Sequence, residues 1–478
     1  MAKMVTQMSK KLHWLTVGEA ASQISDGSLS PTEYVGAICD RIESVESEVQ
    51  NFEFLAADDA MAAAREIERE IEAGLYRGPL HGIPFTAKDL IEVDGVPMTG
   101  GSDALTDYTS ATTATVVERL RKAGAIFLGK VVAHEFAIGV TSPPARNPWN
   151  TEAVPGGSSG GSASAVAAGQ APLSIGTDTG ASVRNPAALN GTVGIRPTQG
   201  RVPLTGVVPM SMTFDTAGPL ARSTEGAAHM LGAMAGYDDA DPASATAPVP
   251  DFTAGPGDSL EGLTVGVPEN YFFTHIEPDV EQAVRDAVDR LVDLGMDRVY
   301  ISMPDVGQTV SIWNNIVPPE NAALFEDFLH TDREAVGDSV EQHVMLGTQV
   351  LAKDYARANQ MRTVVQQNFA QAFEAADVLV TPTTAATAKV PESREEPITI
   401  EVEYDDGYSE DIAWAYSRYT LPVSLAGVPA TVVPCGFDSD DLPIGMQIVT
   451  PAFEEAMSLQ VAHAYEQATD WSERTPPL

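Results

Sequence analysis

Apolar residues follow two patterns along the chain, one with the spacing of a helix face and one of short continuous runs. Residues 15–75 have a helix start at Ser30-Pro31 and are rich in alanine and glutamate, which predicts a helical N-terminal region. From about residue 80, short apolar runs such as 125–132 alternate with amphipathic stretches. Alternation of this kind is typical of a mostly parallel sheet with helices on its faces.

The second half of the chain continues this alternation. A segment rich in proline, alanine and aspartate at 238–260 predicts a surface excursion. Residues 305–375 are largely helical by pattern, and we expect them to shape a substrate pocket. The other elements predicted here are strand 263–267, helix 277–295, strand 298–304 and the strands within 378–381, 430–434 and 445–449.

Charge narrows the classes of function. The chain of 478 residues has 28 basic and 67 acidic residues, a net charge of −39, whereas nucleic-acid binding needs a basic surface. We therefore expect no nucleic acid as a partner. The acidity suits solubility in general and also a high-salt cytoplasm. A dense acidic stretch at 391–411 lacks regular ligand spacing, which favours a solvated loop or hairpin over a cation site.

The termini and the cysteines indicate the compartment. The N-terminus has no apolar core of a secretory signal, and no run approaches the ~20 apolar residues that span a bilayer. Two cysteines, Cys39 and Cys435, are too few for a disulfide framework. We expect a cytoplasmic protein without a membrane partner. The scattered histidines predict no metal site, and no motif predicts a cofactor.

Two runs rich in glycine and serine, 156–169 and 176–191, carry the candidate chemistry. They contain Ser158 and Ser182, at positions where glycine lets the backbone turn tightly and approach a ligand. Lys88 follows an apolar stretch upstream. A serine hydroxyl is a weak nucleophile until a base takes its proton, and a desolvated lysine is one such base. The three residues together predict a Ser–Ser–Lys hydrolase.

These runs and other motifs along the chain resemble the amidase signature family, serine hydrolases that cleave C–N bonds. The resemblance implies one α/β domain over residues 1–478, with a central mixed, mostly parallel twisted sheet covered by helices on both faces. Residues 80–235 would be its catalytic core, and 305–375 and 390–415 its substrate-pocket segments. The motifs that carry the resemblance are GIPFTAKDL (82–90), GKVVAHEFAIG (129–139), NPWN (147–150), both serine runs, GIRPTQGRVP (194–203), DTAGPLARS (215–223), VLVTPTT (378–384), LAGVPA (425–430) and LPIGMQIV (442–449).

The resemblance implies a role for each member of the triad. Ser182 matches the nucleophile, Ser158 matches a serine that bridges it to the lysine, and Lys88 matches the base. In relatives, the peptide bond before the bridging serine is cis. Lys88 must be desolvated to be neutral near pH 7, since an ordinary lysine has a pKa near 10.4.

The loop around the nucleophile would supply the oxyanion hole, because a tetrahedral intermediate needs preorganised N–H donors. Its donors would be the backbone N–H groups of Thr179, Gly180, Ala181 and Ser182. Ala181 departs from the commonest pattern, in which a glycine stands at this position. If the position required a positive φ, alanine would strain the loop by about 1 kcal/mol.

Three further residues would support the triad. Ser159 is expected either to orient the lysine or to stabilise its own loop. Asp178 and Arg184 bracket the nucleophile with opposite charges, which favours an ion pair that clamps the loop over a role in substrate binding.

Residues 311–325 offer apolar side chains for a substrate pocket, although the core face of a helix explains them equally well. If they line the site, the substrates would be neutral and apolar amides, with esters or carbamates as further substrates. The candidates are Ile312, Trp313, Ile316 and Leu324.

Two kinds of family member remain in competition. In the A subunit of the tRNA-dependent glutamyl/aspartyl amidotransferase, a glutamine-binding aspartate occupies the position of Ser417 here. Arg362 resembles an arginine of many relatives. Because the aspartate is absent, we expect a free-standing amidase acting on a small molecule as a monomer or homodimer. The alternative is the amidotransferase component, which is a glutaminase.

Overall fold

One large sheet runs through the computed structural model, which describes residues 12–255, 257, 259–394 and 398–478. Its strands are β1 (Phe52–Leu55), β2 (Pro84–Lys88), β3 (Ile126–Val131), β4 (Leu173–Asp178), β5 (Val193–Arg196), β6 (Thr216–Ala221), β7 (Thr264–Pro268), β8 (Asp297–Ile301), β9 (Val378–Pro382), β12 (Ala430–Phe437) and β13 (Pro443–Val449). These 11 strands lie in the order β1-β3-β2-β4-β6-β5-β12-β13-β9-β7-β8.

The pairing of neighbouring strands makes the sheet mixed. Parallel pairs form two groups, β3-β2-β4 and β9-β7-β8. The pairs between these groups, and the edge pair of β1 with β3, are antiparallel. The parallel order that alternating strands and helices predict is therefore found in two separate parts of the sheet. The strands β6, β5, β12 and β13 lie between these two parts and are joined by antiparallel pairs. Of these, β12 and β13 come from the C-terminal part of the chain.

Helices cover both faces of this sheet. The α-helices are α2 (Val17–Ser25), α3 (Pro31–Val49), α4 (Ala57–Glu72), α5 (Thr115–Lys122), α6 (Gly160–Ala167), α7 (Arg184–Asn190), α8 (Thr224–Met234), α9 (Glu269–Phe272), α10 (Pro278–Asp293), α11 (Thr309–Thr331), α12 (Asp338–Gly347), α13 (Ala352–Ala372), α14 (Ile412–Ala415), α15 (Leu421–Ala426) and α16 (Glu455–Gln467). Short 3-10 turns are η1 (Asp103–Leu105), η2 (Glu135–Ala137), η3 (Val306–Gln308), η4 (Arg333–Ala335) and η5 (Trp471–Glu473).

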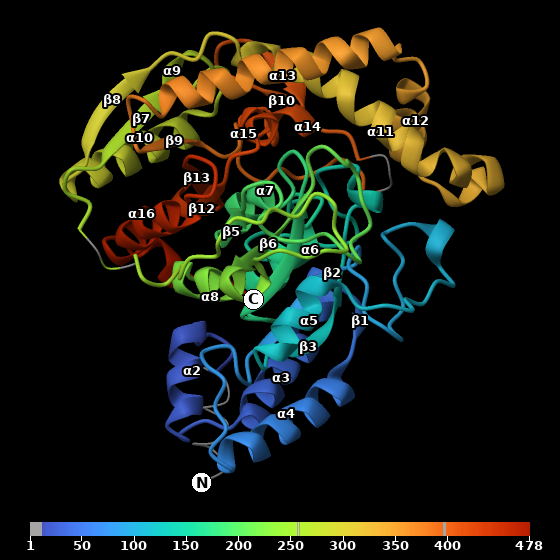
Figure 1. Ribbon diagram of the computed structural model, residues 1–478, viewed down its shortest axis with the longest axis vertical. Helices are drawn as coiled ribbons and strands as arrows, with labels where there is room; N and C mark the ends of the chain where they lie inside the picture. The colour runs from blue at the N-terminus through green and yellow to red at the C-terminus, as the bar shows by residue number, and fades with distance from the viewer. Residues whose placement is uncertain (1–11, 256, 258, 395–397) are drawn as a thin grey trace.

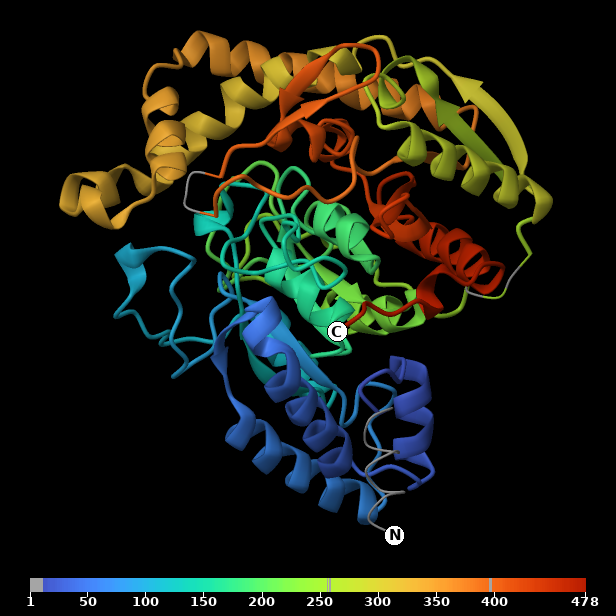
Figure 2. The ribbon, with the colours of Figure 1, turned by 180° about the vertical axis from the view of Figure 1, so that it is seen from behind.

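The core is divided by the sheet. Helices α6 and α7 enclose a small apolar cluster with strands β6 and β12, separate from the main core. Helices α5, α8, α16 and α10 contact one another in that order and pack on the sheet strands. The N-terminal helices and the α11–α13 group lie at opposite ends of the molecule (Figures 1 and 2). The α/β class and the mixed sheet with helices on both faces are thereby confirmed.

The prediction of a wholly helical region at 15–75 is wrong at one place. Helix α3 does begin where expected, with Ser30 as its N-cap and Pro31 as its first residue. Residues Phe52–Leu55, however, form β1, whose side chains alternate between half-buried and exposed positions. A four-residue strand is too short to interrupt a helical pattern in the sequence, and pairing with β3 at the sheet edge decides its structure.

The expectations for the second half hold more closely. Helix α10 occupies most of 277–295, and α11, α12 and α13 fill most of 305–375. The acidic stretch 391–411 includes a two-stranded hairpin of β10 (Glu401–Glu403) and β11 (Ser409–Asp411), while 395–397 lie outside the described residues. Within the described part of the chain, no helix has the length and apolar character needed to cross a membrane.

Candidate active site

Lys88 is the last residue of β2, and all five side chains of this strand are buried. Its Nζ donates hydrogen bonds to Ser158 Oγ at 2.7 Å and to Thr177 Oγ1 at 2.8 Å. Burial lowers the pKa of Lys88 from its ordinary value to about 7, against the carboxylates of Asp215 and Asp178, which act to raise it. The amine can therefore lose its proton near neutral pH.

Ser158 lies in the loop that leads into α6 and follows a cis peptide bond from Gly157. The amide side chain of Asn185 holds this glycine at both backbone groups, at 3.0 Å and 2.8 Å. A Cβ at Gly157 would lie 2.7 Å from the carbonyl carbon of Val140, so the close approach of two backbones requires glycine here. The loop is thus fixed at the residue directly before the bridging serine.

Ser182 stands in the loop between β4 and α7, and 6% of its surface is exposed, whereas Lys88 and Ser158 have none. In the described part of the chain, no hydrogen bond outside regular helices and strands uses the N–H groups of residues 179–182. These groups are the donors that the sequence predicts for an oxyanion. Ala181 does not have a positive φ, so the alanine causes none of the strain considered for this position.

A buried ion-pair network lies beneath this loop. Asp178 accepts from Arg184 and from Arg196, each at 3.0 Å, and all three side chains are fully buried. Burial acts to raise the pKa of Asp178, but the two guanidinium groups outweigh it and hold this pKa well below its usual range. The structure thus contains the predicted pair of Asp178 with Arg184 and adds Arg196, which the sequence analysis missed.

Arg184 also ties the nucleophile loop to the C-terminal part of the chain. Its guanidinium donates to Gly180 O at 2.8 Å, Thr420 O at 2.9 Å, Ser424 Oγ at 2.7 Å and Gln447 Oε1 at 3.2 Å. Arginine suits this position because its planar group offers five donors in fixed directions. Its role in the structure is to clamp the loop rather than to face a ligand.

Ser159 stabilises its own loop, and Thr177, for which the sequence predicted no role, contacts the lysine. Ser159 Oγ donates to Thr177 O at 3.1 Å and accepts from Thr177 N at 3.2 Å, and it does not contact the lysine. The second partner of the lysine is instead Thr177 Oγ1. Of the two roles expected for Ser159, the structure therefore shows the stabilisation of its loop, through the backbone of β4, and not a hydrogen bond to Lys88. In the sequence, the one feature that could have pointed to Thr177 is its place at the end of a buried apolar strand, next to Asp178.

The predicted pocket residues divide into two groups. Trp313 stacks on Phe214, with ring centroids 5.6 Å apart, and a Cβ at Gly180 would lie 2.8 Å from its Cη2 atom. This indole therefore lies against the nucleophile loop. Ile312 and Ile316 are one helical turn apart and are buried in the main apolar core. For them, the alternative of a helix core face describes the packing.

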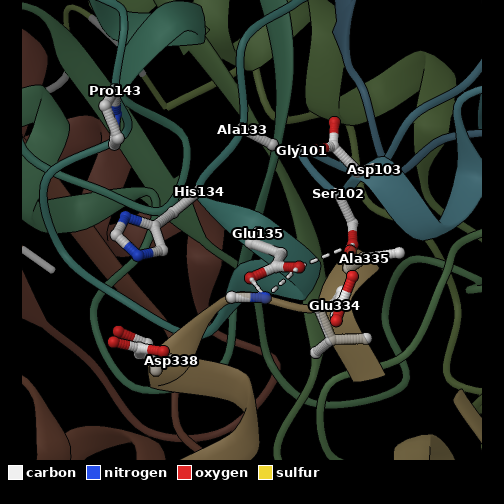
Figure 3. Close-up of a pocket in the computed structure, with 13 residues that line it drawn as sticks. Gly101, Ser102, Asp103, Ala133, His134, Glu135, Pro143, Glu334, Ala335 and Asp338 are labelled. Atoms are coloured by element: carbon white, nitrogen blue, oxygen red, sulfur yellow. Dashed lines mark hydrogen bonds between the residues drawn. The ribbon is translucent and has the colours of Figure 1, made fainter. Parts of the chain in front are cut away.

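A cavity of about 260 Å³ lies beside the bridging-serine loop and is lined by Gly101–Asp103, His134 and residues 334–339 (Figure 3). Backbone N–H of His134 donates to Ser158 O at 3.0 Å. Its Nδ1 accepts from Ser142 N at 3.1 Å, and burial lowers its pKa to about 4, so the imidazole is neutral. Among the described residues, no group of three His, Cys, Asp or Glu side chains could hold a metal ion.

Comparison with known proteins gives a consistent assignment. The model of the Amidase family matches residues 33–459. A curated relative, the A subunit of glutamyl-tRNA(Gln) amidotransferase from Chloroflexus aggregans, is 38% identical over 98% of this chain and 99% of its own length. A solved bacterial aryl acylamidase has a TM-score of 0.89 and 25% identity, covering 97% of this chain and 98% of its own. The solved A subunit of this amidotransferase from Thermotoga maritima has a TM-score of 0.77 and 28% identity, covering 95% of each chain.

These comparisons correct one expectation from the sequence. A monomer or homodimer that acts on a small molecule alone, without nucleic acid, was expected from the charge and from Ser417. The curated relative, similar over nearly its whole length, is named as one subunit of an enzyme of glutamyl-tRNA. That finding overturns the expectation. Net charge describes the average surface of one chain and carries no information on what a second chain would bind.

Proposed function

Because the chain belongs to the Amidase family, we propose that it hydrolyses the carboxamide of glutamine as the A subunit of a glutamyl-tRNA amidotransferase. The observation that carries the chemistry is the buried hydrogen bond of 2.7 Å from Lys88 to Ser158, beside Ser182. The place of the chain in a larger enzyme is supported by the name of the 38% identical relative. The family itself consists of enzymes that cleave amide bonds, so the open question is the substrate.

The first half of the reaction forms an acyl-enzyme. Neutral Lys88 takes the proton of Ser158, which takes the proton of Ser182 as Ser182 Oγ attacks the amide carbon. The developing oxyanion accepts from the N–H groups of the loop 179–182, where removal of a single donor typically costs about 10²–10³-fold in rate. The C–N bond then breaks, the proton returns through Ser158 to the leaving nitrogen, and ammonia departs.

The second half uses the same groups in reverse. A water molecule gives its proton through Ser158 to Lys88 and attacks the acyl carbon. Collapse of the second tetrahedral intermediate breaks the bond to Ser182 Oγ, which recovers its proton, and glutamate leaves. Each proton taken by Lys88 is thereby returned within one cycle. A lysine whose pKa lies near 7 suits both directions, because it accepts and releases a proton at similar cost.

In this proposal the tRNA is bound by another chain of the enzyme. The chain described here has a net charge of −39, and direct contact with phosphates would be repulsive over most of such a surface. A basic partner chain would instead be attracted to it. Ammonia, a small neutral molecule, is then the species that passes from this chain to the aminoacyl ester.

Recognition of glutamine must differ from that in relatives with an aspartate at the position of Ser417. The Ser417 hydroxyl donates to Ala413 O and supplies no charge to the site. Arg362 is the candidate for the substrate carboxylate. Its guanidinium lies 4.8 Å from the centroid of Phe214, the ring that stacks on Trp313. We propose that Arg362 binds the carboxylate of glutamine, a role separate from that of the aspartate, whose position is occupied here by Ser417.

The test is ammonia release from glutamine, measured for the purified chain and for the chain with its partner subunits and glutamyl-tRNA. We expect little glutaminase activity alone, strong activity in the assembly, and none for Ser182→Ala in either. Glutaminyl-tRNA should form in step with the ammonia. Absence of glutamine hydrolysis in the complete assembly, with an active Ser182, would disprove the choice of substrate.

A second candidate substrate, an aryl or alkyl amide, is favoured by the apolar wall of Trp313, Phe214 and Leu421 beside Gly180. Esters and carbamates are further substrates under this alternative, because the same acyl-enzyme would form. Release of nitroaniline from an acyl nitroanilide, with no ammonia from glutamine under any condition, would select it. Trp313→Ala should then raise KM for the anilide more than it lowers kcat.

A further inference from the structure

Asp215 lies just before β6 and is buried beside the nucleophile loop. One carboxylate oxygen accepts from Thr179 Oγ1 at 2.6 Å. The other accepts from the backbone N–H of Met210 at 2.8 Å and of Ser211 at 3.0 Å. A single carboxylate therefore joins the loop of the nucleophile to the neighbouring loop 210–215.

Helix α11 holds this second loop through two adjacent residues. Glu320 accepts from the hydroxyls of Ser211 and Thr213, and from Tyr355 of α13 at 3.1 Å. Asn321 Nδ2 donates to Met210 O at 2.6 Å. The carboxylate of Glu320, a residue with only 9% of its surface exposed, is thus satisfied by neutral donors, as a buried charge requires.

We propose that Asp215 and Glu320 are positioning residues, which connect α11 through loop 210–215 to Thr179 and so fix the oxyanion donors around Ser182. The proposal rests on the proposed role of Ser182 as nucleophile. The connection from α11 to Thr179 is unbroken: Glu320 accepts from Ser211, the Ser211 N–H donates to Asp215, and Asp215 accepts from Thr179, all between buried or half-buried groups. Trp313, on the same helix, contacts Gly180, the next residue after Thr179.

The physical reason lies in how an oxyanion hole works. Its donors stabilise a transition state only when they already point at the developing charge, within about 0.5 Å of the productive position. The loop 179–182 is irregular and is anchored from below by Asp178 and the two arginines. That network does not hold the Thr179 side chain. The peptide plane that carries the Thr179 N–H is held at Asp178 O by Arg196 and by Thr216 Oγ1 at 3.1 Å. The bond to Asp215 adds a hydrogen bond from the side chain of Thr179 and so fixes the position of this residue against loop 210–215.

The positioning role can be tested without knowledge of the substrate by the rate at which an alkyl fluorophosphonate labels Ser182. Ser182 Oγ forms a bond to phosphorus as the P–F bond breaks, fluoride leaves, and the serine proton passes through Ser158 to Lys88. The phosphonyl oxygen occupies the oxyanion hole during this step. The maximal labelling rate and the half-saturating probe concentration are measured separately for the full chain, with the labelled residue identified by mass spectrometry.

The variant Thr179→Val removes the hydroxyl but keeps the shape of the side chain. We expect the maximal labelling rate to fall by about 10²-fold, with the half-saturating concentration nearly unchanged. Thr179→Ser restores the hydroxyl and should restore most of the rate. Asp215→Asn should also lower the rate, because an amide has a single acceptor oxygen and cannot keep both the bond from Thr179 and the bonds from Met210 and Ser211. The double variant should lose little more than the more severe of the two single variants, because both act on the same connection. Glu320→Gln should lower the rate by about tenfold.

The matched control is Thr115→Val, which removes a hydrogen bond of the same length, 2.6 Å, to Asp238 at a site remote from the triad. It should leave labelling unchanged. A Thr179→Val rate within threefold of the wild type, a Thr179→Ser variant that rescues nothing, or additive losses would each overturn the proposal. Failure of the wild-type chain to be labelled at Ser182 would instead count against the proposed function itself.

Discussion

Single side chains decide the chemistry, and Lys88 shows how. A lysine is a base near neutral pH only if its charged form is disfavoured by more than its neighbours stabilise it. At the end of β2 its amine contacts two neutral hydroxyls, while the nearest carboxylates act only through space. Asp89, its neighbour in sequence, is instead paired with Lys130 at 2.7 Å. The lowering of the Lys88 pKa by burial is therefore larger than the rise caused by the carboxylates.

The pH dependence of activity tests this state directly. The protonated amine cannot accept a proton, so kcat/KM should rise with pH through about 7 and become constant near pH 8, well below the ~10.4 of a free lysine. Activity rises with pH because the active form of Lys88 is the neutral amine, and it does so near pH 7 because burial lowers the pKa of this lysine. Glutamine hydrolysis from pH 5 to 10 measures it. A flat profile, with chemistry rate-limiting, would contradict a lysine base.

The three residues of the triad should act as a unit. Ser182→Ala should lower kcat by about four orders of magnitude or more, because no acyl-enzyme can form. Ser158→Ala and Lys88→Ala should each be severe, and the triple variant should be little worse than Ser182→Ala. Single-turnover rates on one amide substrate compare them. Losses that add across the three sites would show that they do not share one proton path.

At this scale the sequence predicted residue identities better than contacts. Ser182, Ser158 and Lys88 stand in recognisable motifs, so their proximity could be inferred from resemblance. That Thr177 rather than Ser159 contacts the lysine depends on which way two neighbouring hydroxyls point from a strand end and a loop. Arg196 ends β5 and Asp215 lies just before β6, and these two strands pair only after folding, so spacing along the chain could not reveal either residue.

At the scale of elements, α11 is the part that bears on the site most. It carries Trp313 near its start and Glu320 in its middle, and it contains Pro318 and Pro319. Proline lacks a backbone donor, so acceptors one turn earlier lose their partners. Gly347, at the end of α12, lies so close that a Cβ there would be 2.0 Å from Pro318 O. The pairing of α11 with α12 therefore depends on that glycine.

Gly347→Ala should destabilise the protein despite the better helix propensity of alanine, worth about 1 kcal/mol. The new methyl group meets backbone rather than a movable side chain, and such overpacking costs about 1–3 kcal/mol. Urea unfolding of both proteins measures the difference. Gly36→Ala is the control, because this helical glycine has only Met61 Cε nearby, at 3.7 Å. It should be neutral or slightly stabilising. A stabilised Gly347→Ala variant would refute this account of the packing.

The sequence predicted most elements but not their neighbours. Helical spacing and short apolar runs located α10, α13, β3 and β9 well, because burial on one face leaves a local pattern. Strand β1 was missed, since four residues carry too little pattern. The antiparallel pairs around β5 and β12 join residues far apart in the chain. Their pairing depends on tertiary packing that no local period records.

Charge is the property of the whole molecule with the clearest consequence. A net charge of −39 causes self-repulsion, which is greater in the compact state than in the expanded unfolded chain. Salt shortens the range of this repulsion from about 10 Å at 0.1 M to about 3 Å at 1 M. Exposed ion pairs lose strength as well, but each contributes only about 0–1 kcal/mol.

The midpoint of urea unfolding should therefore rise with added KCl between about 0.1 and 2 M. The same concentrations of NaCl serve as control, because screening does not depend on the identity of the cation. A midpoint that falls with salt would show that attractive ion pairs dominate over repulsion. A midpoint that differs strongly between the two salts would indicate specific cation binding instead.

The contacts of Arg184 imply an order of events during synthesis. Its acceptor Gln447 lies 263 residues further along the chain. A ribosome that adds about 5–20 residues per second needs roughly 13–50 s to make that interval. For most of this time the nascent chain already contains Lys88, Ser158 and Ser182, while Arg184 lacks its three C-terminal acceptors, Thr420, Ser424 and Gln447. The growing polypeptide therefore carries a partly anchored catalytic loop until translation is almost over, and a message cut short before that point yields a chain with the triad and the Asp178 ion pairs but without the C-terminal half of the clamp.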